Sequence, residues 1–182
     1  MLRIIKNIFS KKLRPGPEFY NDELHSLGIE LKEHVSKVFG RSLAIRELDS
    51  GSDNAAEIEI NNLSTPHYDI SRFGVDFVAS PRHADVILIT GAITLNMKNA
   101  VLATYNATPR PCWIIAVGDD AYNGGVVGDS YAVLGGADKI LPVDFKIPGN
   151  PPVPSEIMRG LVVFMKLLRE QKNSKSSVEK SQ

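Results

Sequence analysis

The chain has 182 residues, of which 43% are apolar and 23% are charged, so it is long enough to bury one sizeable hydrophobic core. Lysine plus arginine and aspartate plus glutamate both total 21, and this balance excludes a general electrostatic attraction to nucleic acid. The single cysteine, Cys112, excludes an internal disulfide and any multi-cysteine metal site built from this chain alone.

The first element in chain order is a basic N-terminal segment, residues 1–16. Its sequence MLRIIKNIFSKKLR carries five basic residues, no acidic residue, and large apolar residues at helical spacing. This pattern is typical of a short amphipathic helix on a membrane surface or in a partner's groove, and a frayed terminus is the alternative. Neither a secretory signal nor an apolar run of about 20 residues is present, so we expect a cytoplasmic protein.

Residues 17–171 are predicted to form a single α/β domain, and the polar residues 172–182 a disordered tail. The strand candidates are rich in β-branched residues, and the helix candidates have apolar residues at steps of three and four. In chain order, the pattern predicts a helix over 17–40, a strand over 42–48, a loop opening a helix over 49–60, strands over 74–80 and 85–90, a helix over 91–109, and strands over 112–118 and 139–144. A last helix is predicted over 157–171, with Ser155 as its cap. This alternation indicates a doubly wound, mainly parallel sheet.

The last helix is apolar nearly all round. It carries more apolar residues than packing against one face of a sheet requires. This excess predicts that the helix is buried on several sides, either inside this domain or under a neighbouring protein. They are Ile157, Met158, Leu161, Val162, Phe164, Met165, Leu167 and Leu168.

Ligand sites of doubly wound sheets form beyond the carboxyl ends of the strands. Four loops are predicted to meet there, over 49–56, 90–94, 118–125 and 147–152. The third loop places the adjacent acids Asp119 and Asp120 directly after a buried strand. We therefore expect these acids to lie where a ligand would bind.

Several long motifs give the chain a specific resemblance to a known family. The segments DSGSDNAAEIEI, YDISRFGVDFVASPRHADVILITGAIT, AVGDDAYNGGVVGDSYAVLGGADKILPVD and IPGNPPVPSEIMRGL occur in this order between about residues 42 and 169. They resemble the 20 kDa (B-type) small subunit of respiratory complex I and of group 4 nickel–iron hydrogenases. The resemblance implies a flavodoxin-like fold and a peripheral subunit on the cytoplasmic side of the membrane. Its implied partners are a large hydrogenase-like or complex-I-like subunit and membrane-arm subunits.

The resemblance also implies one four-iron, four-sulfur cluster, held by cysteines at four motif positions. In this chain those positions are Asp53, Ala56, Asp120 and Asn150, and none is a cysteine. Iron–sulfur clusters of this type are held by thiolates, whereas carboxylates are hard ligands and alanine supplies no ligand. We therefore expect the cluster to be lost, no intact cofactor or metal site, and a structural subunit that is not itself catalytic.

Alternative interpretations of the same residues remain open. Asp53, Asp119 and Asp120 could bind a divalent cation, although acids at loop starts more often cap helices or face solvent. DAYNGGVVGDS could hold a phosphate group in a stand-alone flavodoxin-like protein, but it lacks a recognised nucleotide-binding pattern. A third hypothesis is an electron carrier whose cluster has unusual or partner-supplied ligands.

Overall fold

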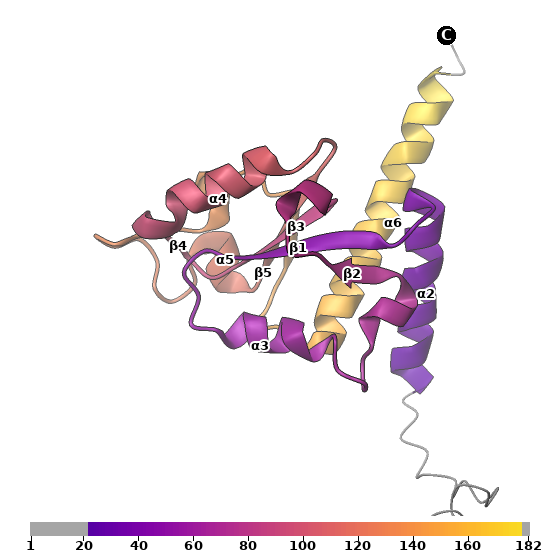
Figure 1. Cartoon of the computed structure of the whole chain (residues 1–182), viewed down its shortest axis with the longest axis horizontal. Helices are drawn as coiled ribbons and strands as arrows, with labels where there is room; N and C mark the ends of the chain where they lie inside the picture. The colour runs from indigo at the N-terminus through magenta and orange to yellow at the C-terminus, as the bar shows by residue number, and fades with distance from the viewer. Residues whose placement is uncertain (1–21, 180–182) are drawn as a thin grey trace, which may run out of the picture.

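Five parallel strands form the central sheet of the computed structural model, which describes residues 22–179 (Figure 1). They are β1 (Leu43–Asp49), β2 (Val75–Phe77), β3 (Val86–Thr90), β5 (Trp113–Val117) and β7 (Phe145–Ile147). Their order across the sheet is β2-β1-β3-β5-β7. Counted along the chain, this is the 2-1-3-4-5 order of flavodoxin-like folds, so the predicted fold class is confirmed.

Helices cover both faces of the sheet. One face carries α2 (Asp22–Phe39), α3 (Ala55–Asn62) and α6 (Pro154–Glu179), and the other carries α4 (Leu95–Ala107) and α5 (Asp119–Asn123). Figure 1 shows α2 and α6 side by side, with α4 at the far end of the molecule. Two short strands, β4 (Ile93–Thr94) and β6 (Val133–Gly135), form a separate antiparallel pair. Single 3-10 turns occur at Ile70–Phe73, Pro81–His83 and Ala137–Lys139.

The apolar C-terminal helix is buried largely within this domain. Seven of its eight predicted core residues are buried, and Leu167 is 44% exposed. The helix α6 packs against α2, α3 and β7, so three neighbours cover it. Phe164 contacts the rings of Trp113 and Phe145, which ties the helix to the sheet. The domain therefore accounts for this burial without a partner.

The predicted strand over 139–144 is wrong. Pro142 has no N–H to donate to a strand ladder, and the chain pairs with β5 only from Asp144 onward. Asp144 N donates to Ile114 O at 2.9 Å, and Ile114 N donates to the Asp144 carboxylate at 2.8 Å. This exchange places Phe145 beside Ile115 and shifts the strand to Phe145–Ile147.

Two helix boundaries also differ from the prediction. The helix predicted from residue 91 begins at Leu95, because Ile93 and Thr94 pair with β6 and Thr94 Oγ1 accepts a hydrogen bond from Met97 N. The last helix continues to Glu179 rather than ending at Gln171, so residues 172–179 are helical where a disordered tail was predicted. That stretch contains neither glycine nor proline to stop a helix. The basic segment 1–16 lies outside the described residues.

Candidate functional site

The loops that follow β1, β3, β5 and β7 meet at the carboxyl edge of the sheet, as predicted. Ser50 is fully buried there, and its hydroxyl proton is shared between Thr90 O at 2.7 Å and Gly91 O at 2.8 Å from Oγ. The third and fourth loops are joined by Asp119 N, which donates to Gly149 O at 2.8 Å. The Ser50 bonds therefore join the loops after β1 and β3, where the strand order reverses, and the Asp119 bond joins the loops after β5 and β7.

The four motif positions come together in this region and are called the carboxyl-edge site here. Asp53, Ala56, Asp120 and Asn150 line one cavity, which encloses only about 10 Å³. A space of this size is about enough for a single water molecule. The four positions therefore converge, and the fold leaves little space between them.

Asp53 has a local structural role. Its carboxylate accepts a hydrogen bond from Ala55 N at 2.9 Å, at the first turn of α3. The preceding acid, Asp49, acts similarly, since its carboxylate accepts from Gly51 N at 2.7 Å and Ser52 N at 2.8 Å. These bonds fit the interpretation of Asp53 as a residue that satisfies backbone donors near a helix start.

Asp119 and Asp120 have different environments. Asp119 forms an ion pair with Lys146 at 3.3 Å, and Lys146 also lies 4.2 Å from the centre of the Tyr122 ring. Asp120 places one carboxylate oxygen, Oδ1, in a buried position without a hydrogen-bond partner. A Cβ atom at Gly125 would lie 1.5 Å from this oxygen, and Gly125 has a φ of +52°, so only glycine fits beside it.

The geometry does not favour the two alternative ligands. Within residues 22–179 no group of three or more acidic, histidine or cysteine side chains is arranged to hold a metal ion. Of the segment DAYNGGVVGDS only Asp120 lines the cavity at this edge, and a space of about 10 Å³ is enough for one water molecule but not for a phosphate group.

The side chains at the carboxyl-edge site also do not fit a thiolate-held cluster. Two carboxylates, one amide and one methyl group supply no sulfur, and Asp53 already bonds to its own helix. Cys112 lies before β5, at the opposite edge of the sheet, next to Arg110. Burial raises the pKa of its thiol above the ordinary value, and the nearby Arg110 partly opposes this shift. No step of electron transfer is therefore assigned to these residues.

One feature near this edge was missed in the sequence. The loop between α5 and β6 exposes three large apolar side chains, Val126 (90% exposed), Val127 (60%) and Tyr131 (95%), which are called the loop tip here. Figure 1 shows this segment projecting beyond β4, at the end of the molecule away from α2 and α6. The sequence does contain an indication of this exposed apolar loop, namely two adjacent valines and a tyrosine within a glycine-rich, otherwise polar stretch.

The fold and the site define a flavodoxin-like domain whose ligand edge is closed by its own loops. Comparison with known proteins then gives the family. The model of the NADH ubiquinone oxidoreductase, 20 Kd subunit, matches residues 54–164, and the chain belongs to this family.

Named relatives are similar over most of the chain. Formate hydrogenlyase subunit 7 of Escherichia coli K12 is 40% identical over 141 residues, which are 78% of this chain and 55% of that protein. The chain thus spans about half the length of this relative. The probable membrane-bound hydrogenase subunit mbhJ of Pyrococcus furiosus is 41% identical over 134 residues, covering 74% of this chain and 80% of that one. The B-type subunit of the NADH-quinone oxidoreductase of Geobacter metallireducens is 42% identical over 117 residues, covering 64% and 68%.

A solved structure supports the same relationship. A chain of the membrane-bound sulfane sulfur reductase, an archaeal respiratory membrane complex, superposes with a TM-score of 0.65 at 32% identity. The match covers 78% of this chain and 77% of that one.

Proposed function

We propose that this chain is the small subunit of a membrane-associated oxidoreductase assembly of the complex I or membrane-bound hydrogenase type, and that its role there is structural. The observation that carries the proposal is the combination of family membership over residues 54–164 with four ligand positions that contain no thiol. Relatives named as subunits of a hydrogenase, a formate hydrogenlyase and a quinone oxidoreductase support the assembly.

The structural role follows from the chemistry of the carboxyl-edge site. Asp53, Ala56, Asp120 and Asn150 supply no sulfur ligand, and the space between them is about 10 Å³. The loops around them are nevertheless held by buried hydrogen bonds from Ser50. Loops that keep this arrangement without cluster ligands are best explained by contacts that the loops make with neighbouring subunits.

The loop tip provides a surface for the large subunit. Its three apolar side chains are exposed on the loop that follows α5, the helix that carries Asp120, and exposed apolar groups that cluster on one loop are typical of a protein interface. Leu95, which is 49% exposed, lies beside the same loop in the backbone, because its N–H donates to Ala132 O at 2.9 Å.

Attachment to the membrane is peripheral and on the cytoplasmic side in this proposal. None of the helices within residues 22–179 is long and apolar enough to cross a bilayer. The basic residues of segment 1–14 supply charge for anionic headgroups or acidic loops, at about 1 kcal/mol each near such a surface.

The test is purification of the tagged full chain from membranes of its own host, followed by mass spectrometry of the proteins that accompany it. The proposal predicts a stoichiometric large subunit related to hydrogenases or complex I, together with integral membrane subunits. Recovery of the chain as a monodisperse soluble monomer without such a subunit would contradict it. A matched preparation from cells that express only the tag controls for adventitious binding.

A further inference from the structure

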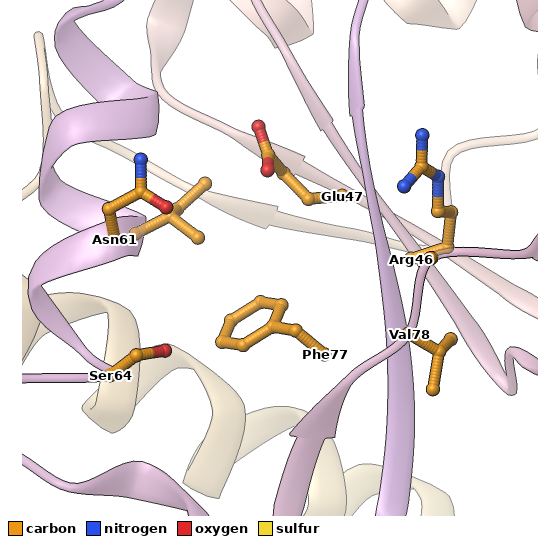
Figure 2. A pocket seen from close by; sticks show the side chains of 8 residues that line it. Arg46, Glu47, Asn61, Ser64, Phe77 and Val78 are labelled. Carbon is orange, nitrogen blue, oxygen red and sulfur yellow. The ribbon is translucent and has the colours of Figure 1, made fainter.

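Two cavities lie away from the carboxyl-edge site. The first encloses about 220 Å³ between α3 and the strands β1 and β2 (Figure 2). Figure 2 shows the Glu47 carboxyl group on one side of β1 and the Arg46 guanidinium on the other, and the rest of the lining is uncharged. This lining does not select one class of ligand.

The second cavity lies where α2 and α6 begin and is called the helix-start pocket here. It encloses about 180 Å³, between the first turns of these two helices and the segment that follows α3. This volume is below the roughly 300–1,000 Å³ of sites that hold drug-sized molecules, so it suits a single small chemical group. Four of its lining residues carry hydrogen-bond donors, and they are His67, Tyr68, Ser155 and Arg159.

Three of these residues have donors that no internal hydrogen bond uses. Within residues 22–179, the imidazole of His67, the phenol of Tyr68 and the hydroxyl of Ser155 form no hydrogen bond with another residue. The His67 ring lies edge-on to the Tyr68 ring, with the ring centroids 4.8 Å apart. Because all three residues line one cavity, their donors are available to a ligand that enters it. They are called the unpaired donors here.

Arg159 supplies a positive charge to the same cavity. Its Nη2 donates to the Glu23 carboxylate, and both side chains are more than half exposed. A guanidinium has five N–H groups in a fork that matches phosphate oxygens, so one bond to Glu23 leaves donors for a second oxyanion. An exposed ion pair contributes little to stability, so a ligand can also compete with Glu23 for the guanidinium.

The start of α6 favours a negative ligand in this pocket. Ser155 lies in the first turn of α6, where backbone N–H groups lack partners inside the helix and a negative group is stabilised. The neighbouring Glu156 is directed elsewhere, since its carboxylate accepts a hydrogen bond from Val153 N at 3.4 Å and it does not line the pocket. Glu23 is therefore the one carboxylate in the lining.

The number and kind of donors fit a phosphate group. A phosphate presents at least three acceptor oxygens in different directions, and arginine binds two of them through parallel, charge-assisted hydrogen bonds. We propose that the helix-start pocket binds one phosphate group, held by Arg159 and the unpaired donors. The carboxylate of Glu23 competes with this ligand for the guanidinium.

The first test titrates the purified full chain with methyl phosphate and follows binding by NMR. Saturable shifts of the His67 and Tyr68 signals are expected. Arg159→Gln should raise the dissociation constant at least about tenfold, because it removes charge-assisted hydrogen bonds. Glu23→Gln should lower it about two- to fivefold, because it removes the competing carboxylate. Thermal melting establishes that each variant is folded.

Lys166→Gln is the matched control. Lys166 is also a basic residue of α6 that forms an ion pair with a glutamate of α2, Glu30, but it lies two turns further along and does not line the pocket. This variant should leave the dissociation constant unchanged. An equal loss with Arg159→Gln and Lys166→Gln would mean general electrostatic attraction and would overturn the proposal, as would unchanged binding by Arg159→Gln.

Two sources could supply the phosphate group: the headgroup of a membrane lipid, or a free phosphorylated small molecule. The second test compares sedimentation of the same variants with vesicles made of equal parts of phosphatidylcholine and phosphatidylglycerol. Weaker sedimentation of Arg159→Gln, but not of Lys166→Gln, assigns the phosphate to the lipid. Binding of methyl phosphate with equal sedimentation assigns it to a small molecule.

Absence of methyl phosphate binding together with equal sedimentation refutes the helix-start pocket as a phosphate site. The lipid source rests on the peripheral attachment in the proposed function. The two can fail separately, because the proposed function fails only if the unmodified chain is recovered without a large subunit.

Discussion

Replacing the apolar side chains of the loop tip should weaken assembly without weakening the fold. Val126 and Tyr131 are 90% and 95% exposed, so nearly the whole of each side chain is available for burial against a partner. Full burial of a valine-sized side chain contributes about 1.5–3 kcal/mol, which corresponds to a change of about 10- to 150-fold in a dissociation constant. Val126→Ser and Tyr131→Ser should each weaken binding of the large subunit within this range.

The measurement is a quantitative pull-down of the large subunit from solubilised membranes over a range of concentrations. The free energy of unfolding should change by less than about 0.5 kcal/mol, because neither side chain is packed in the isolated domain. Ile29→Ser provides the control, since Ile29 is 52% exposed on α2, far from the loop tip. Equal dissociation constants for the unmodified chain and both loop-tip variants would refute the reasoning, as would an equal loss with Ile29→Ser.

The remaining predictions concern the core, the environment of Glu47 and the N-terminal segment. Phe164→Ala should lower the free energy of unfolding by about 3–5 kcal/mol in denaturant titrations, because Phe164 is 3% exposed and packs on two aromatic rings. The control is Val163→Ala at the adjacent, half-exposed position, which should lower the free energy of unfolding far less. Burial raises the pKa of Glu47 in the folded state, so the folded chain holds the proton of this carboxyl group more tightly than the unfolded chain does. The free energy of unfolding therefore falls as pH rises from the ordinary pKa of 4.5 through the raised pKa. Glu47→Gln should remove this part of the decline in melting temperature as pH rises above 4.5, and an unchanged decline would contradict the assigned environment of Glu47. Deleting residues 1–14 should leave the α/β domain folded but reduce its recovery in the membrane fraction at low salt. Equal recovery of the truncated and the full chain would show that the folded domain makes the membrane attachment.

The central sheet was predictable where a strand is buried on both faces. The stretches VILI and WIIAV are apolar without interruption, and they lie in β3 and β5 in the middle of the sheet. At the sheet's edge the pattern failed, because the apolar residues of KILPVD surround Pro142 and the ladder begins beyond them at Phe145. The two-residue strand β4 was missed because a pair that short has no periodicity to detect.

The carboxyl-edge site was predictable for a topological reason. Parallel strands end at one edge, so residues that follow β1, β5 and β7 must meet there, and Asp53, Asp120 and Asn150 do. The cavity between α3, β1 and β2 was not predictable, because the residues that line it come from two strands and a helix with no shared motif. Their proximity depends on how α3 packs over β1, which sequence periodicity does not specify.

The central claim is that the chain keeps the family fold without a thiolate-held cluster. Anaerobic reconstitution of the full chain with iron and sulfide, followed by iron and sulfide analysis and electron paramagnetic resonance of the reduced sample, tests it most directly. A variant with cysteine at all four positions of the carboxyl-edge site is the positive control, because it tests whether the loops can hold a cluster when thiols are present. It is expected to take up iron. The account predicts that the natural chain gains no stoichiometric cluster, whereas four irons per natural chain with a reducible paramagnetic signal would contradict it.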